Sequence, residues 1–240
     1  MSLHAEENPF DTNTEAQWIS LSDLMTGLMM VFLLIAVAYM IKIESDVAKT
    51  RQVAVVYQEV RHDLYKDLVK DFDKDLPGWG AEITKDLAVR FNEPDVQFNT
   101  GKADLKPRFQ QILADFFPRY VKIITADKYK GAIQEIRVEG HTSSTWNGAA
   151  TQEDAYYNNM ELSQARTRST LRYILGLPGV EKDSDWLRSH VTANGLSSSH
   201  PIKQADGTED MARSQRVEFR IRTDADSKIA TIVGPAAAKQ

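Results

Sequence analysis

An ionisable side chain, Asp23, stands at the start of the most apolar segment of the chain. The residues from Leu24 to Ile41 read LMTGLMMVFLLIAVAYMI, about 18 residues without a charge, and including Trp18 to Ser22 extends the segment to the ~20 that cross a bilayer. A carboxylate at that depth costs about 2.5–3.5 kcal/mol on insertion scales, so we expect it to be protonated or paired. The pattern predicts one transmembrane helix over residues 18–42 that carries a switchable charge.

A short polar strip accompanies this acid. At helical spacing Asp23 shares a face with Ser20, Thr26 and Gly27, and we expect that face to contact protein rather than lipid. Acids inside a membrane commonly mark ion pathways, which is the functional interpretation of Asp23. The alternative is that Asp23 is the N-cap of a helix that begins at the headgroup level.

The flanks of the span bear on its processing and orientation. Residues 1–17 contain no Lys or Arg and several acids, unlike the basic start of a cleaved signal peptide, so we expect an uncleaved anchor. Basic residues follow the span at Lys42, Lys49, Arg51 and Arg61. By the positive-inside rule, this charge pattern alone favours a cytoplasmic C-terminal side.

Composition describes the rest of the chain. It has 240 residues, 26% of them charged, and a net charge of −5, which argues against the basic surface of a nucleic-acid-binding protein. The absence of cysteine excludes disulfides, thiolate catalysis and cysteine metal sites. We expect one globular unit with appendages, and no direct nucleic-acid partner.

Residues 43–80 are predicted to form a helical linker. Val53, Tyr57, Val60 and Leu64 fall at heptad-like spacing, which suits either a dimerising stalk or plug, or a helix packed on its own domain. At the end of this segment three alternate aspartates resemble the start of a calcium loop, but Leu76 stands where that loop needs glycine. We expect no metal site there.

Beyond residue 80 the chain alternates between strand-like and helix-like segments, which predicts an α+β sandwich over residues 81–223 and a flexible tail over 224–240. Strands are expected at ITKDLAVRF, VQF, QEIRVEG, HVTANG and RVEFRIR, with helices over residues 107–124 and 159–176. Gly140 and Gly195 are expected at turns.

The apolar segment SDLMTGLMMVFLLIAVAYMI resembles the transmembrane helix of MotB-type stator subunits. The resemblance aligns Asp23 with the family's ion-carrying aspartate. It implies a homodimer of such helices inside a pentameric MotA-like membrane protein, with the aspartate alternately binding and releasing an ion. Thr26 would help to coordinate that ion; we expect H⁺, with Na⁺ as the alternative, and no bound cofactor.

The segments FNTGKADLKP, IRVEGHTSS, NMELSQARTRSTLRYI and QRVEFRI resemble, in order and spacing, the motifs of OmpA-like peptidoglycan-binding domains. The family grips the carboxylate and amine of diaminopimelate with an arginine and an aspartate. The residues that the resemblance assigns to peptidoglycan binding here are Thr142, Ser143, Asn159, Leu162, Arg166 and Arg216.

Two of these residues, Ser143 and Arg216, allow alternative roles. Ser143 stands where the family has the aspartate, so affinity is lower, or Glu153 or Asp154 substitutes, or the wall ligand differs. Arg216 suits a fold-supporting role and a ligand role equally. His141 is expected to be structural, and with no nucleophile-base pair or nucleotide loop the chain is expected to be no enzyme.

Within the MotB type, SLSDLMTGLMMVFLLIA and the acidic N-terminus resemble most the ZorB subunits of Zorya anti-phage systems. The resemblance implies a wall-anchored motor subunit in the inner membrane that works with a ZorA-like partner. A wall-binding domain would require a cytoplasmic tail over residues 1–17 and a periplasmic C-terminal domain, against the basic-residue pattern. The alternatives are a flagellar stator subunit, a passive peptidoglycan tether, or a TolR-like force transducer.

Overall fold

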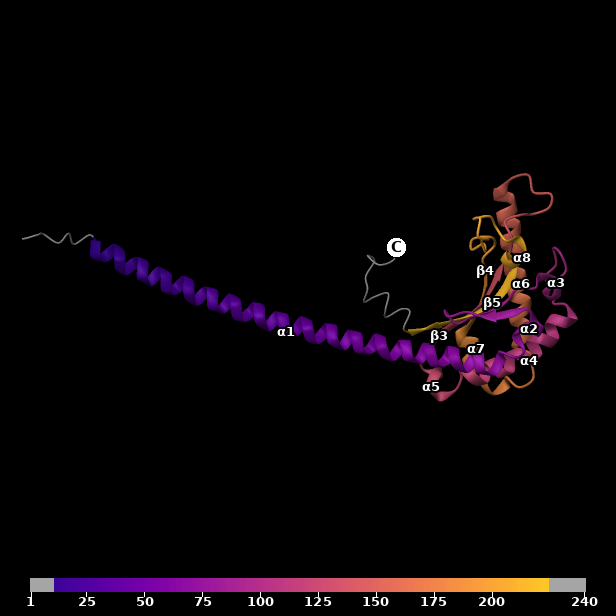
Figure 1. Ribbon diagram of the computed structural model, residues 1–240, viewed down its shortest axis with the longest axis horizontal. Helices are drawn as coiled ribbons and strands as arrows, with labels where there is room; N and C mark the ends of the chain where they lie inside the picture. The colour runs from indigo at the N-terminus through magenta and orange to yellow at the C-terminus, as the bar shows by residue number, and fades with distance from the viewer. Residues whose placement is uncertain (1–10, 225–240) are drawn as a thin grey trace, which may run out of the picture. The chain divides into compact units, whose positions relative to one another are not determined.

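The computed structural model describes the backbone of residues 11–224 (Figure 1), and side chains for Trp18, residues 21–47 and residues 58–224. Residues 1–10 of the predicted cytoplasmic tail and 225–240 of the predicted flexible tail lie outside the described part. The chain divides into two compact units, Met1–Val53 and Ala54–Gln240.

Helix α1 runs without a break from Asp11 to Phe72. Its apolar stretch, Leu21–Val47, is long and hydrophobic enough to cross a membrane, and none of it is buried by the residues that the structure describes. Asp23 lies about three turns inside the helix, so it is not the N-cap of α1. The helix extends beyond the predicted span of residues 18–42 at both ends, and its C-terminal part takes in most of the predicted helical linker over residues 43–80.

The last turns of α1 belong to the folded domain rather than to a free linker. Leu64, Leu68 and Phe72 recur at i, i+4 and i+8, and each is 0% exposed within the hydrophobic core. Val60 packs against the same core, whereas the side chains of Val53 and Tyr57 fall outside the described set. From Val60 onward the helix therefore packs on its own domain; a dimerising stalk stays a prediction for the earlier residues.

Arg119 of helix α4 (Pro107–Ile124) holds this end of α1 by charge as well as by packing. Its Nε lies 3.0 Å from Asp71 and its Nη1 lies 2.9 Å from Asp75, while its guanidinium stacks over the Phe72 ring at 4.7 Å. Two of the aspartates that resemble a calcium loop are therefore ion-paired to an arginine, which explains their spacing without a metal.

A five-stranded sheet, in the order β1-β2-β5-β3-β4, forms the centre of the domain. All neighbouring strands are antiparallel except β3 and β4, which are parallel. The strands are β1 Ala81–Ile83, β2 Ala88–Phe91, β3 Ile133–His141, β4 Val191–Gly195 and β5 Arg216–Thr223.

The two faces of the sheet differ in polarity. Along β5, Val217, Phe219 and Ile221 alternate with Arg216, Glu218 and further charged residues, as expected for a strand with one apolar face. The apolar face packs against α4, α6 (Gln152–Ile174) and the end of α1, and an aromatic cluster around Phe116 and Phe219 fills the space between them. The predicted α+β layering is confirmed.

Short elements complete the domain. The remaining helices are α2 Leu76–Trp79, α3 Pro94–Gln97, α5 Asp127–Lys130, the 3-10 helix Glu181–Asp183, α7 Ser184–His190 and α8 Met211–Ser214.

Three local predictions were wrong. The segment ITKDLAVRF forms the hairpin β1–β2 instead of one strand, because the chain turns before Leu87, which has a φ of 63°. The segment VQF is not a strand: Val96 and Gln97 lie in α3, which begins at Pro94, and Phe98 is the C-cap of this helix. Helix α6 begins at Gln152 rather than residue 159, because the Thr151 side chain caps it by accepting a hydrogen bond from the Asp154 amide.

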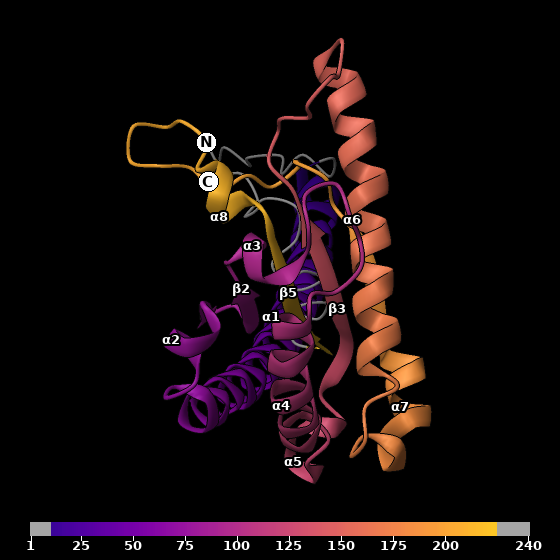
Figure 2. The same ribbon diagram turned by 90° about the vertical axis from the view of Figure 1, so that its right-hand side faces the viewer.

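Gly140 and Gly195 serve close packing rather than turns. They are partners across β3 and β4, and α6 runs alongside these strands (Figure 2). A Cβ on Gly195 would lie 2.3 Å from the Gln164 backbone nitrogen, and one on Gly140 would lie 2.6 Å from Thr167 Cγ2. The two glycines let α6 approach the sheet closely enough to present its side chains beside the end of β3.

Replacing Leu68 by Ala tests whether α1 ends inside the domain. We expect a loss of about 2–5 kcal/mol in the free energy of unfolding, because the substitution leaves a cavity in a fully buried site. Urea denaturation of the detergent-solubilised chain, followed by tryptophan fluorescence, measures it. Lys66→Ala, on the exposed side of the same turn, should stay within about 0.5 kcal/mol; equal effects would contradict the packing of α1.

Candidate functional site

The membrane-type segment of α1 carries the first pair of candidate residues, Asp23 and Thr26. They lie three positions apart, and therefore on neighbouring turns of one helix face. Thr26 Oγ1 donates a hydrogen bond to the carbonyl oxygen of Ser22 at 2.7 Å, which fixes the hydroxyl with its lone pairs turned outward. Both side chains are exposed on α1, so their assigned role requires a neighbouring protein surface. That role stays a prediction.

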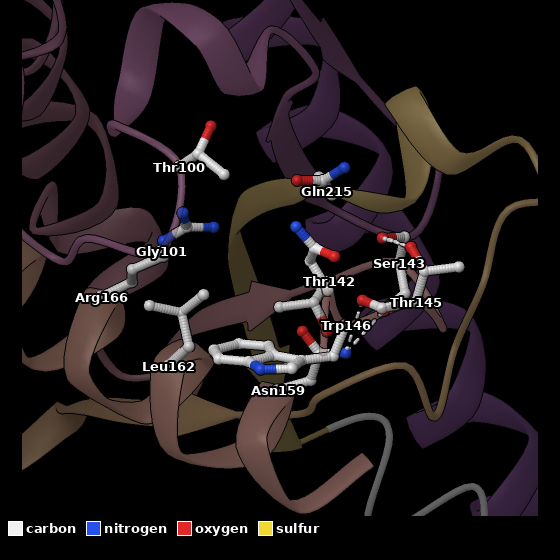
Figure 3. Close-up of a pocket in the computed structure, with 11 residues that line it drawn as sticks. Thr100, Gly101, Thr142, Ser143, Thr145, Trp146, Asn159, Leu162, Arg166 and Gln215 are labelled. Atoms are coloured by element: carbon white, nitrogen blue, oxygen red, sulfur yellow. Dashed lines mark hydrogen bonds between the residues drawn. The ribbon is translucent and has the colours of Figure 1, made fainter. Parts of the chain in front are cut away.

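A pocket of about 390 Å³ in the C-terminal domain gathers most of the other candidates (Figure 3). It lies between the loop that follows β3, the middle of α6, and the loop around Gly101. The candidates that line it are Thr142, Ser143, Asn159, Leu162 and Arg166. The pocket has six further lining residues that were not expected from the sequence: Thr100, Gly101, Thr145, Trp146, Asn147 and Gln215.

Arg166 is the charged residue of this pocket. It is 9% exposed, its Nε and Nη2 donate to the carbonyl oxygens of Lys102 and Asn99 at 2.9 and 3.3 Å, and it stacks on Phe98 at 4.8 Å. Burial lowers the pKa of Arg166 to about 10, and no carboxylate of the described residues offsets this. A buried guanidinium held only by carbonyls is suited to bind an anion, above all a carboxylate.

Asn159 shapes the opposite wall. Its Nδ2 donates to the backbone oxygens of Ser143 and Thr145, both at 3.1 Å, and so holds the loop after β3 against α6. Ser143 Oγ lies 3.3 Å from Thr145 Oγ1. Thr142 Oγ1 is buried without a hydrogen-bond partner in the described part of the chain. An unpaired buried hydroxyl at a pocket wall is a place where a ligand can bond.

The acids proposed to replace the missing aspartate do not line this pocket. Asp154 accepts from the Thr151 hydroxyl at the start of α6, and Glu153 also lies outside the lining. A different acid, Glu209, approaches the loop and accepts from the backbone nitrogen of Ser144 at 3.1 Å. No pattern in the sequence pointed to Glu209, because 65 positions separate it from Ser144.

Arg216 lies on the other side of the sheet. Its Nε is 2.6 Å from Glu218 Oε1, and its Nη1 donates to the carbonyl oxygens of Ser214 and His200. These contacts favour its fold-supporting role. The preceding residue, Gln215, lines the pocket instead, because successive strand residues face opposite sides.

A buried charge cluster surrounds Arg216 on that polar face. Glu139, His141 and Glu218 offer ligand atoms within 4.8 Å of one another, the spacing of a metal site. The carboxylates are committed elsewhere: Glu218 lies 2.6 Å from both Arg216 and Arg220, and Glu139 lies 3.0 Å from Arg220. Guanidinium groups so close would repel a cation, so the arrangement suits an internal ion-pair network better than a metal centre.

The same cluster predicts how stability depends on pH. Burial, aided by the charge of Arg216, lowers the pKa of His141, although Glu139 and Glu218 oppose this. The unfolded chain then binds more protons below about pH 6.5, so stability should fall as the pH drops from 6.5 through the lower pKa of the folded state. His141→Gln should flatten the unfolding free energy between pH 7 and 5.5, measured by urea titration.

A control separates this effect from general acid sensitivity. His62→Gln removes an exposed histidine and should leave the decline in place. The carboxyls with lowered pKa values, such as Glu139, add their own loss only below about pH 4.5. A decline that persists in His141→Gln would contradict the assignment.

Comparison with known proteins identifies the domain and then the chain. Residues 97–215 match the model of the OmpA family. A putative MotB-like protein from Desulfovibrio vulgaris has a similar structure, with a TM-score of 0.51 and 24% identity over 71% of this chain and 99% of that one. The Outer membrane protein A of Serratia odorifera is 30% identical over 53% of this chain and 48% of its own.

The similarity to a Zorya protein is more extensive. The Zorya protein ZorB of Escherichia coli strain Crooks is 46% identical over 217 residues, which cover 90% of this chain and 92% of that protein. The chain therefore belongs to the ZorB family, MotB-type proteins with a C-terminal OmpA domain.

Proposed function

We propose that this chain is the peptidoglycan-anchored, stator-like subunit of an ion-driven motor in the inner membrane, acting in anti-phage defence. One observation carries the proposal: a single chain joins an apolar helix with a carboxylate to an OmpA-family domain whose pocket holds a buried guanidinium without an acidic partner among the described residues. A motor needs both parts, because an ion-driven rotor produces useful torque only against a fixed anchor.

The motor half rests on Asp23. Its carboxylate would bind an ion where it faces a protein wall and release that ion where it faces water, because an uncompensated charge is costly away from water. Thr26 would support the same ion from the next turn. We propose a homodimer of these helices inside a pentamer of a ZorA- or MotA-like membrane protein.

The anchor half rests on Arg166. Peptidoglycan stem peptides carry free carboxylates, and a buried guanidinium with two N–H groups bound to carbonyls is oriented to take one in a defined direction. The pocket gives the wall a fixed point on the domain. Because α1 ends in the core of that domain, force on the pocket would reach the base of the helix through packed side chains.

The proposal requires residues 1–17 in the cytoplasm and the C-terminal domain in the periplasm, which the basic residues after the span oppose. The chain has no cysteine, so single cysteines report topology cleanly. Ala205→Cys, at an exposed site of the domain, should react with a membrane-impermeant maleimide in cells with a permeabilised outer membrane. Ser2→Cys should react only after lysis. The reverse pattern would overturn the proposed function.

A further inference from the structure

Trp146 lines the pocket that holds Arg166, and its role follows from what the pocket lacks. Of the eleven residues that line the pocket, Arg166 carries the charge and none is acidic. In the view of Figure 3 the Trp146 indole lies between Arg166 on one side and Ser143 and Thr145 on the other. A carboxylate in this pocket can therefore pair with the Arg166 guanidinium. A bound cation meets only neutral polar groups and the aromatic face of Trp146.

Neutral oxygen atoms line the same pocket as the indole. Thr142 Oγ1 is buried and unpartnered among the described residues. Asn159 donates through Nδ2 to the loop oxygens, which leaves its Oδ1 as an acceptor on the same wall. These hydrogen bonds also hold residues 143–145 in place, and this loop segment leads directly into Trp146.

We infer that Trp146 takes the place of an acidic partner in this pocket. When an α-amino acid group of a peptidoglycan stem peptide binds with its carboxylate on Arg166, its ammonium lies on the face of the Trp146 indole. The inference rests on the proposed function and assigns the second half of the same site. A desolvated ammonium needs a partner, and an indole is the strongest aromatic partner for a cation. The Thr142 and Asn159 oxygens accept its N–H groups.

Three synthetic tripeptides, L-Ala–γ-D-Glu–meso-diaminopimelate, test the inference by calorimetric titration of the full chain in detergent. One carries the free side-chain amine and carboxylate, one has that amine acetylated, and one has that carboxylate amidated. The wild-type chain should bind the free peptide about 3- to 30-fold more tightly than the acetylated one, the range expected for a cation-π contact. The amidated peptide should bind weakly, because Arg166 loses its partner.

Substitutions at Trp146 then separate a cation-π contact from simple packing. Trp146→Leu should bind the free peptide as weakly as the acetylated one, while its affinity for the acetylated peptide stays near wild type, which also shows that the variant folds. Trp146→Phe should retain part of the preference. Ser143→Asp supplies an acid on the pocket wall and should restore the preference for the free amine in the Trp146→Leu background.

The outcomes distinguish two failures. If Trp146→Leu keeps the full preference for the free amine while Arg166→Ala abolishes binding, the role of Trp146 is wrong and the proposed anchor stands. If the wild-type chain binds none of the three peptides and does not sediment with purified cell walls, the anchor function itself fails.

Discussion

Asp23→Asn is expected to reduce phage protection to the level of cells that lack the gene, while the protein remains in the membrane and still sediments with cell walls. Asparagine has nearly the same shape but no proton to exchange, so the helix persists and the ion cycle stops. Efficiency of plating measures protection, and a cytoplasmic pH indicator in cells that express the chain with its membrane partner measures proton entry.

Matched variants sharpen this test. Asp46→Asn makes the same chemical change beyond Lys42, near the end of the apolar stretch, and should retain protection. Asp23→Glu keeps a titratable carboxyl one methylene further from the backbone and should retain part of the activity. Full protection by Asp23→Asn, combined with loss of protection when wall binding is removed, would instead indicate a passive peptidoglycan tether.

Arg166→Ala is expected to abolish sedimentation of the detergent-solubilised chain with purified peptidoglycan and to remove phage protection as well. Truncating one partner of a buried charge pair typically costs about 2–5 kcal/mol, or about 30- to 5000-fold in affinity. Arg166→Lys should recover little, because an ammonium cannot bond the Lys102 and Asn99 carbonyls and a carboxylate in the same geometry.

The stability of this variant is part of the prediction. Arg166 is a buried cation without an acidic partner among the described residues, so removing its desolvation cost should offset part of the lost hydrogen bonds and stacking. The variant should lose less unfolding free energy than the about 2–5 kcal/mol expected of Leu68→Ala. Arg168→Ala, two residues along α6 and exposed, should leave wall binding unchanged. A large loss of stability in Arg166→Ala would show that the arginine serves the fold and would remove the main support for a carboxylate site.

The family, the apolar span and the layered α+β domain could be predicted from the sequence because each depends on local patterns. Hydropathy over about 20 residues marks a span without reference to the rest of the chain. The strands β3 and β5 and helix α4 show periods of two and of 3.6 residues, which local side-chain contacts impose. The grouping of Thr142, Asn159 and Arg166 followed from motif order.

Other features depend on contacts between residues far apart in the chain, and they required the tertiary structure. The last turns of α1 have the same amphipathic pattern whether they pair with another chain or pack on their own domain, and only the buried positions of Leu64 and Phe72 decide between the two. Likewise, the sequence predicts a turn at Gly195. In the structure a glycine is required there because a Cβ would lie 2.3 Å from the Gln164 backbone nitrogen.

The pocket shows the same division. The resemblance to OmpA-like motifs nominated Arg166 and left the role of Arg216 undecided. In the structure Arg216 contacts Glu218, whereas the preceding residue, Gln215, lines the pocket. The residue type of Asp154 suits it to replace the acid missing at Ser143, but in the structure Asp154 accepts a hydrogen bond from Thr151 at the start of α6 and does not line the pocket. The sequence therefore determined which groups are available for the proposed ion movement and the proposed carboxylate binding. The tertiary structure decided which of them meet, because pairing and burial depend on distances that the linear order does not contain.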